Sequence, residues 1–170
     1  MLQAIKKVVF LGDGGVGKTS LIRRFLENKT SNEITVGVDF RYVKLNDTIV
    51  VLWDFSGQER FRALIENLVS GASLIVMVFD LSRSKTFFNL FKWAEIIQRY
   101  LGDVPVIIVG NKKDLDARLE ENVLKDTLSQ LPLRVVAYLE TSAKTGENVS
   151  TLFSMISKFL RTKKVTAPIS

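Results

Sequence analysis

The sequence predicts an α/β fold, in which helices cover both faces of a mostly parallel sheet. Continuous apolar runs of strand length, such as residues 74–80 and 104–110, recur along the chain. Longer stretches with the period of a helix separate these runs. The 170 residues contain no repeat, low-complexity tract or Pro/Gly-rich linker, so they are expected to form one domain.

The elements are expected in a regular order. The first strand leads through a glycine-rich turn into a helix with Leu21, Ile22, Phe25 and Leu26 on one face. The next two strands form a hairpin at Asn46-Asp47, the one antiparallel element expected. The strands are expected at residues 6–12, 38–45, 48–54, 74–80, 104–110 and 135–139. The later helices are expected at residues 84–101, 116–130 and 148–163, followed by a frayed tail at residues 165–170.

Composition excludes several kinds of chemistry. The chain has no cysteine, which removes disulfides, thiolate metal sites and the attachment of prenyl or palmitoyl groups. It has no histidine either, so the commonest general base and the commonest zinc ligand are missing. Any chemistry must therefore use carboxylates, amides, hydroxyls, lysine or a bound metal ion.

Charge and hydropathy predict a protein of the cytoplasm. The longest apolar run, residues 74–79, is far shorter than the roughly 20 residues of a membrane span, and the first residues do not resemble a signal peptide. The net charge is +6, and its basic residues are scattered apart from Arg161, Lys163 and Lys164. We interpret the excess as a solvated surface, with weak membrane attraction as the alternative and no nucleic-acid partner.

The glycine-rich turn has the chemistry of a phosphate loop. Residues 12–19 read Gly-Asp-Gly-Gly-Val-Gly-Lys-Thr between a strand and a helix, as that motif requires. Glycines let successive backbone N–H groups turn toward phosphates, and the helix N-terminus adds positive potential. Lys18 is expected at the outer phosphates and the Thr19 hydroxyl on Mg²⁺. The plainer interpretation is an ordinary strand-to-helix turn. The residues predicted to bind the phosphates are Gly14, Gly15, Val16, Gly17, Lys18, Thr19 and Ser20.

Residues 111–114, Asn-Lys-Lys-Asp, are predicted to select the base. They follow a strand that ends at Gly110, so they lie at the sheet edge where such folds bind ligands. The Asp114 carboxylate can accept hydrogen bonds from N1–H and the 2-amino group of guanine, a donor pair that adenine lacks. A charged loop after a strand is the alternative. The residues predicted at the base are Asn111, Lys112 and Asp114.

Further candidates lie near other strand ends. Asp54 is expected to hold Mg²⁺ through water, the Gly57 N–H to meet the γ-phosphate, and Gln58 to orient the attacking water. Thr35, in the polar loop before the second strand, is expected to close on Mg²⁺ and the γ-phosphate, although it also fits an ordinary loop residue. Backbone N–H groups after the last strand are expected to reach the guanine oxygen. These belong to Ser142, Ala143 and Lys144, of which Ser142 also fits a helix cap.

In this order, the motifs resemble the Ras superfamily of small GTPases, and its Rab-like branch in particular. The resemblance runs from about Lys6 to Leu160 and rests on GDGGVGKTS, TVGVDF, WDFSGQERF, NKKD and TSAK. TVGVDF and WDFSGQERF favour the Rab-like branch, as does Trp93. The resemblance implies a P-loop NTPase G domain over residues 1–164, with a six-stranded, mostly parallel sheet and five flanking helices.

The resemblance also implies roles and partners. It implies a monomer with two switch loops, around Thr35 and around residues 57–69. Effectors would bind only its GTP form, and activating and exchange proteins would regulate it. The residues implied for catalysis are Gln58, Lys18 and Thr35, and those implied for Mg²⁺ are Thr19, Thr35 and Asp54.

The chain also departs from the Rab pattern. An apolar triad for effectors would be Phe40, Trp53 and Leu68, but leucine replaces the usual tyrosine, and Trp53 fits core packing equally well. The first switch loop and the hairpin are shorter than usual. No aromatic residue between Leu26 and Phe40 can stack on guanine as in relatives. These departures would fit a prokaryotic or archaeal relative.

The function expected from the sequence is hydrolysis of GTP to GDP and phosphate with Mg²⁺, by in-line attack of water. Turnover without a partner is expected to be slow, because the segment between Ser20 and Thr35 is too short for an inserted domain with a catalytic arginine. One alternative is a GTP-loaded scaffold with negligible hydrolysis, against which Gly14 and Gln58 argue. Another is an ATP-using P-loop kinase or ATPase, against which Asp114 argues.

Overall fold

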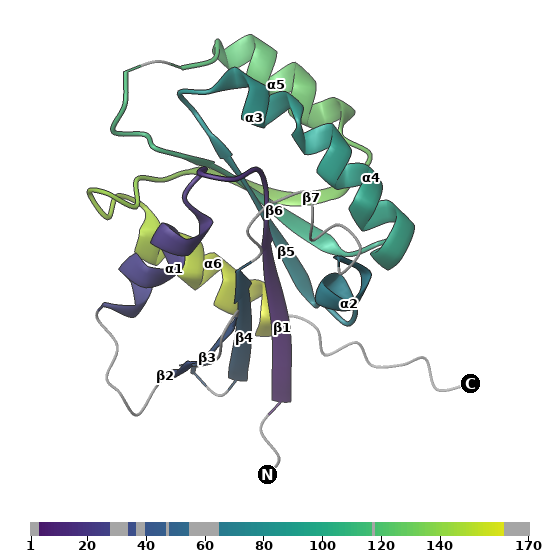
Figure 1. Ribbon diagram of the computed structural model, residues 1–170, viewed down its shortest axis with the longest axis vertical. Coiled ribbons are helices and arrows are strands. Elements are labelled where there is room, and N and C mark those ends of the chain that lie inside the picture. The colour runs from purple at the N-terminus through teal and green to yellow at the C-terminus, as the bar shows by residue number, and fades with distance from the viewer. Residues whose placement is uncertain are drawn as a thin grey trace.

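A central sheet organises the protein (Figure 1). The computed structural model describes residues 4–27, 34–36, 40–46, 48–54, 65–116 and 118–161, with backbone alone at residues 34–36, 40, 54 and 68. The described strands form one seven-stranded sheet in the order β2-β3-β4-β1-β5-β6-β7. They are β1 (Ala4–Leu11), β2 (Ile34–Val36), β3 (Phe40–Leu45), β4 (Thr48–Asp54), β5 (Leu74–Asp80), β6 (Pro105–Asn111) and β7 (Arg134–Glu140).

The predicted sheet is confirmed in its mostly parallel character. Strands β4, β1, β5, β6 and β7 pair in parallel, and β3 pairs with β4 as the expected antiparallel hairpin. The turn of this hairpin contains Asn46 at a φ of 55°. Asparagine tolerates this left-handed conformation better than most residues, which explains why the chain reverses there.

The sequence does not predict the three-residue strand β2, which is added to the six expected strands. Thr35 is expected in a loop, but its backbone pairs with Tyr42 of β3 in antiparallel register. The expectation of a loop at Thr35 is therefore wrong. The physical reason is local, because Ile34, Thr35 and Val36 are all β-branched and favour extended backbone.

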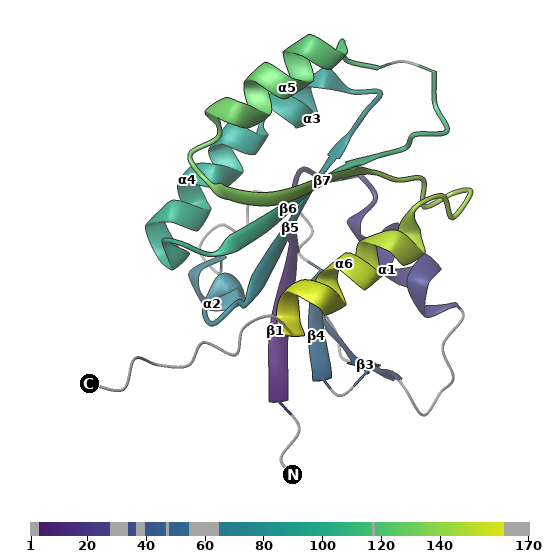
Figure 2. The same ribbon diagram turned by 180° about the vertical axis from the view of Figure 1, so that it is seen from behind.

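Helices cover both faces of the sheet, as expected (Figure 1 and Figure 2). Val8 and Phe10 of β1 belong to the apolar cluster beneath α1 and α6, whereas Val9 and Leu11 belong to the cluster beneath the other helices. All residues of β5 and β6 are buried, as continuous apolar strands require. The helices are α1 (Lys18–Leu26), α2 (Ile65–Val69), α3 (Ser84–Phe88), α4 (Leu90–Leu101), α5 (Glu121–Gln130) and α6 (Val149–Arg161).

The helix predicted at residues 84–101 is divided at Asn89 into α3 and α4. Asn89 keeps helical backbone angles, with φ −67° and ψ −10°. The N–H of Lys92 donates to the carbonyl of Asn89, three residues earlier, over 3.0 Å. This tighter spacing is typical of a 3₁₀ turn, so the two helices follow one another along the same face of the sheet (Figure 1).

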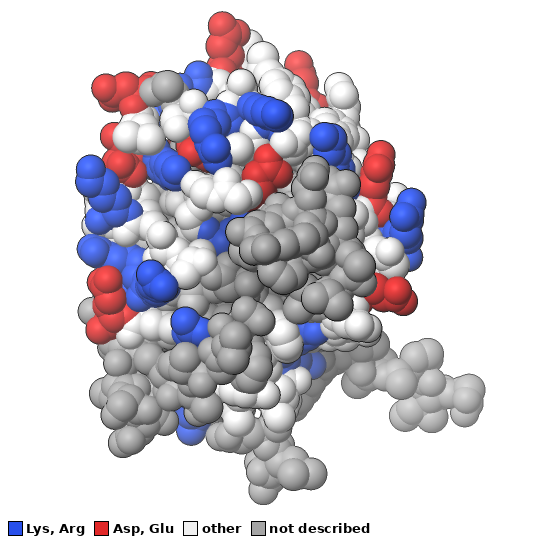
Figure 3. Space-filling model, viewed as in Figure 1, with Lys and Arg blue, Asp and Glu red and all other residues white. Residues whose placement is uncertain are grey.

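Charge is mixed on the surface. On the face shown in Figure 3, basic and acidic side chains are interspersed over the described residues. This pattern agrees with the interpretation of the net charge as a solvated surface. Among the helices of the described chain, none combines the length and the apolar character that crossing a membrane needs.

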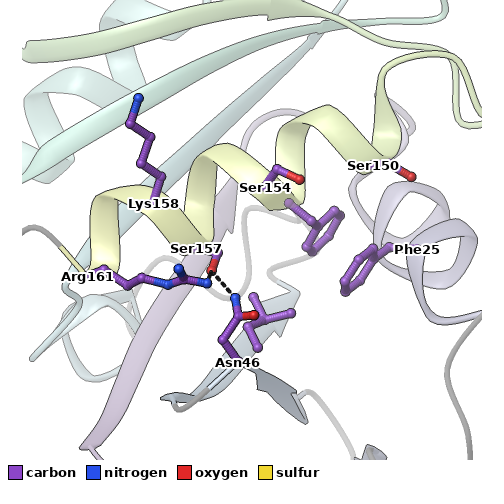
Figure 4. A pocket seen from close by; sticks show the side chains of 9 residues that line it. Phe25, Asn46, Ser150, Ser154, Ser157, Lys158 and Arg161 are labelled. Carbon is purple, nitrogen blue, oxygen red and sulfur yellow. Dashed lines mark hydrogen bonds between the residues drawn. The ribbon is translucent and has the colours of Figure 1, made fainter.

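Stacked aromatic rings anchor α6. Phe153 is 2% exposed, and its ring lies 3.8 Å from that of Phe25 in α1 at an angle of 2°. The ring of Phe10 in β1 lies 6.1 Å away on the same cluster. Farther along α6, Asn46 Nδ2 of the hairpin turn donates to Ser157 Oγ over 2.9 Å (Figure 4). Phe153 therefore packs α6 against both α1 and the sheet.

We predict that Phe153→Ala lowers the free energy of unfolding by about 3–5 kcal/mol, because it removes a buried ring and leaves a cavity. Urea denaturation followed by circular dichroism measures this loss. The control is Phe88→Ala, which removes a ring that is 48% exposed and should cost less than about 1 kcal/mol. Equal losses in the two variants would contradict the assignment of Phe153 as a core anchor.

Candidate functional site

The motifs singled out in the sequence meet at one edge of the sheet. The phosphate loop follows β1, residues 111–114 begin at the last residue of β6, and residues 141–144 follow β7. These strands run in the same direction, so their carboxyl ends share one edge. Open α/β sheets bind ligands at this edge. The fold thus brings together the predicted phosphate and base sites, which are far apart in the sequence.

Close packing requires glycine at two positions of the phosphate loop. Gly12 and Gly17 have φ angles of 145° and 103°, which residues with a side chain avoid. A Cβ on Gly12 would overlap the carbonyl oxygen of Val78 in β5, and one on Gly17 would overlap Nδ2 of Asn111. A Cβ on Gly14, in contrast, would meet no described atom within 4 Å. The loop is therefore held against the ends of β5 and β6.

Lys18 begins α1 and extends back over the loop. Its side chain is 4% exposed, and Nζ donates to the carbonyls of Gly12 over 2.9 Å and Asp13 over 2.7 Å. Thr19 and Ser20 follow in the same turn of the helix. The ammonium charge and the N–H groups of the helix N-terminus thus lie together, as in sites that bind phosphate.

The Asp13 carboxylate fastens the phosphate loop to α4. Its Oδ1 accepts a hydrogen bond from Trp93 Nε1 over 3.0 Å, and its Oδ2 accepts one from Asn89 Nδ2 over 2.6 Å. Neither Asp13 nor Asn89 was a candidate site residue from the sequence, and Trp93 was noted only for the resemblance it supports. The sequence feature that could have indicated this contact is the four-residue spacing of Asn89 and Trp93. That spacing puts two side-chain donors on one face of a helix.

Asn111 connects the phosphate loop with the loop after β7. Its side chain is buried, and Nδ2 donates to the carbonyl of Val16 over 2.9 Å. Its Oδ1 accepts hydrogen bonds from Thr141 Oγ1 over 3.0 Å and from the N–H of Ala143 over 3.2 Å. Asn111 was predicted as a base-site residue, and in the structure it supports both subsites through these contacts.

A cavity of about 510 Å³ opens beside this bridge. Cavities of this size suit small-molecule ligands. The described residues of its wall include no aromatic side chain, which agrees with the missing stacking residue noted in the sequence. The wall is formed by Gly17, Ser20, Arg23, Arg24, Glu27, Asn111, Lys112, Asp114, Leu115, Ala143 and Lys144.

Asp114 brings a negative charge to this cavity. Its Oδ1 accepts a hydrogen bond from Ser142 Oγ over 2.7 Å, and this bond is the main cause that holds the pKa of Asp114 below its usual value. The carboxylate is therefore ionised at neutral pH, the state that accepts two N–H donors. The N–H of Ser142 donates to the carbonyl of Glu147 over 3.1 Å, which corrects the expectation that it reaches the base. Ser142 contributes instead through its hydroxyl.

Lys112 links residues 111–114 to the end of β5. Its φ of 66° is uncommon for a residue with a side chain, and such strain concentrates at ligand sites. Its Nζ lies 3.0 Å from Oδ2 of Asp80, whose side chain is 1% exposed. Burial alone would raise the pKa of Asp80, but hydrogen bonds from Ser82 and Lys112 outweigh it and hold that pKa below its usual value. The buried carboxylate therefore stays charged and fixes the ammonium group of Lys112.

The residues predicted for Mg²⁺ and hydrolysis are described only in part. The backbone of Asp54 ends β4 opposite Phe10 of β1, which places it at the same sheet edge as the phosphate loop. Thr35 lies in β2, with its backbone described. Gly57 and Gln58 lie outside the described residues.

The donor set suits a Mg²⁺ ion that is shared with phosphates. The described part of the chain has no group of three or more His, Cys, Asp or Glu side chains that could hold a metal by itself. Mg²⁺ commonly takes one or two protein ligands and completes its shell with water and substrate phosphates. Thr19 in the first turn of α1 and Asp54 at the neighbouring strand end fit such a site.

Trp53 contacts the core, as the packing interpretation expects. It is half-buried against the cluster beneath α2 and α4, and Lys7 Nζ lies 4.8 Å from its ring centroid. Other predictions lie outside what the structure describes. These are the side chains of Phe40 and Leu68, the basic residues Lys163 and Lys164, and the tail at residues 165–170.

A second cavity of about 510 Å³ lies between α1, the hairpin turn and α6 (Figure 4). Phe25 and several serines of α6, including Ser150 and Ser154, contribute to its wall. Among the predicted nucleotide-site residues that the structure describes, none lines it. Of these two cavities, the one beside Asp114 is continuous with the phosphate loop, because Gly17 and Ser20 line it.

Comparison with protein families agrees with this geometry. A family model described as Ras family matches residues 7–162 of the chain. The match covers nearly the whole chain and includes every motif that meets at the sheet edge.

We predict that Gly17→Ala lowers the affinity for GDP at least about 100-fold, because the new Cβ overlaps Asn111 and displaces the loop. Equilibrium titration with a fluorescently labelled GDP analogue measures this change. Gly102→Ala is the matched control, since Gly102 also has a positive φ of 63° but no described atom within 4 Å of an added methyl group. Wild-type affinity in the Gly17 variant would contradict the packing described above.

Proposed function

The chain belongs to the Ras family of small GTPases, and we propose that the residues gathered at the carboxyl edge of its sheet form the nucleotide site. Ras family proteins are GTP hydrolases that act as molecular switches, so this chain binds GTP and hydrolyses it to GDP and phosphate. The observation that supports the residue assignments best is the Asn111 bridge between the phosphate loop and the base cavity. We propose residues 1–164 as the GTPase domain.

On the phosphate side, the backbone N–H groups of residues 14–20 surround the phosphates and Lys18 neutralises their charge. The contacts of Lys18 with Gly12 and Asp13 support this role, because they hold the ammonium group at the loop before any ligand binds. The anchoring of Asp13 by α4 supports the same assignment. A loop that is already fixed loses little entropy on binding.

On the base side, Asp114 accepts hydrogen bonds from N1–H and the 2-amino group of guanine. Adenine would leave this carboxylate without donors, which is how the site excludes it. Ser142 orients the carboxylate through its hydroxyl. The aliphatic stem of Lys112 flanks one side of the base. The N–H of Lys144 donates to the oxygen of the base, whereas the N–H of Ala143 is used by Asn111 Oδ1.

Hydrolysis depends on residues near the phosphate loop. Thr19, Thr35 and Asp54 would hold Mg²⁺, which neutralises charge that develops on the phosphates. Gly57 would donate its N–H to the γ-phosphate, and Gln58 would orient the attacking water. Hydrolysis-competent relatives keep a small residue where this chain has Gly14.

The finer assignment that we propose is the Rab-like branch. Trp93, which favours this branch in the sequence, supports it, and the structure gives Trp93 a contact with the phosphate loop, because its Nε1 donates to Asp13. The shortened first switch loop and hairpin favour a prokaryotic or archaeal member. Family membership implies activating proteins, exchange proteins and effectors in general terms. We propose that the chain acts as a monomer in the cytoplasm, with Mg²⁺ and without a nucleic-acid partner.

We predict that Asp114→Asn lowers the affinity for GTP about 100-fold or more and allows XTP to bind. The amide can donate to the oxygen that replaces the 2-amino group of guanine. Competition of GTP, XTP and ATP against a fluorescent nucleotide measures the preference. Asp116→Asn makes the same exchange at an exposed carboxylate and should leave the order unchanged. An unaltered preference for GTP over XTP would refute the role of Asp114.

We predict that Gln58→Leu leaves GTP binding intact and slows single-turnover hydrolysis about tenfold or more, because it removes the group that orients water. Gln98→Leu on α4 makes the same exchange away from the site and should hydrolyse at the wild-type rate. A wild-type protein that retains GTP without measurable hydrolysis would favour the scaffold alternative. Unchanged hydrolysis in the Gln58 variant would exclude Gln58 from the mechanism.

A further inference from the structure

Arg83 lies directly on the phosphate loop, although no motif of the sequence includes it. It belongs to the turn after β5, at the same sheet edge as the loop. Its Nη2 donates to the carbonyl of Gly14 over 3.0 Å. The same nitrogen would lie 3.6 Å from a Cβ built on Gly15. The guanidinium group is thus in contact with the Gly14–Gly15 segment of the loop.

A buried carboxylate fixes this guanidinium group in place. Arg83 Nε donates to Asp80 Oδ2 over 3.1 Å, and the backbone N–H of Arg83 donates to the carbonyl of Asp80 over 3.0 Å. The other oxygen, Oδ1, accepts hydrogen bonds from the backbone and hydroxyl of Ser82 over 2.8 and 2.6 Å. Because both carboxylate oxygens of Asp80 accept hydrogen bonds, Asp80 is fixed, and it sets the position of Arg83 before a ligand binds.

Arg83 keeps donors for a further partner. A guanidinium group has five N–H bonds, and the hydrogen bonds described above use one at Nε and one at Nη2. The side chain is 50% exposed, so its outer edge remains open. Planar guanidinium groups match phosphate oxygens well, in pairs of parallel hydrogen bonds.

The position of Arg83 relates it to the phosphates of a bound nucleotide. Gly17, Ser20 and Lys112 line the cavity assigned to the base. Arg83 shares Oδ2 of Asp80 with Lys112, and its Nη2 contacts the Gly14–Gly15 segment of the phosphate loop. The guanidinium group therefore lies between the base cavity and the phosphate loop, where its charge acts on the phosphates.

We infer that Arg83 is a further phosphate-binding residue, a cationic group supplied in cis that acts together with Lys18. This inference rests on the proposed function, because it requires that the glycine-rich loop binds phosphates. It assigns to the phosphates an arginine of this chain, whereas the motifs of the sequence indicated no such arginine.

The test compares Arg83→Ala, Arg83→Lys and the wild type in their affinities for a non-hydrolysable GTP analogue, GDP and GMP. Each nucleotide is titrated with Mg²⁺ at low and at physiological salt. We expect Arg83→Ala to weaken the binding of the GTP analogue and of GDP about tenfold, and that of GMP less, because GMP carries the smallest phosphate charge. Arg83→Lys should recover part of the loss, and salt should reduce the difference from wild type. Arg99→Ala removes the same charge from an exposed position of α4 and serves as the control.

The outcomes are distinguishable. An equal loss for the GTP analogue, GDP and GMP would show that Arg83 only shapes the loop, and it would overturn the inference. Wild-type affinities in Arg83→Ala, or an equal effect in Arg99→Ala, would overturn it as well. A wild-type protein that bound neither GTP nor GDP would overturn the proposed nucleotide site itself.

Discussion

The nucleotide site depends on a single buried amide, that of Asn111. Its side chain is 2% exposed, and it donates to the loop after β1 while it accepts from the loop after β7. An amide carries a donor and an acceptor side by side in one plane and keeps both at neutral pH. A carboxylate would face the carbonyl of Val16 without a proton, and an apolar side chain would leave buried polar groups unpaired, at about 1–3 kcal/mol each. The left-handed Gly17 is what allows the amide to approach the loop so closely.

The sheet explains why polar chemistry collects at this edge. Strands β5 and β6 are buried along their whole lengths, so polar side chains have no place until each strand ends. Their last residues, Asp80 and Asn111, are partners in the register of the two strands. Both side chains are buried and both are satisfied by several hydrogen bonds, as buried polar groups require. Because the strands are parallel, Asp80 and Asn111 each support a neighbouring loop of the site.

The sequence predicted the parts of this protein that depend on local pattern. Continuous apolar runs identified β5 and β6, and the glycine-rich and NKKD motifs indicated the two proposed subsites, which the fold brings to one edge of the sheet. Contacts between distant side chains have no such pattern. The partners of Asp13 are 76 and 80 residues away, and Arg83 is 69 residues from Gly14. Their positions follow from how α4 and the end of β5 pack against the loop, which a single sequence does not specify.

The parts of the proposed site are held by very different numbers of contacts, which matters for a molecular switch. The phosphate loop and the base cavity are held by buried side chains from β5, β6 and α4. Thr35, in contrast, lies in a strand of three residues at the edge of the sheet, where β3 is its single neighbour. A short edge strand has few hydrogen bonds to lose, so its displacement costs little free energy. The contact with the γ-phosphate that we propose for Thr35 can therefore shift this strand without disturbing the side chains that hold the phosphate loop and the base cavity.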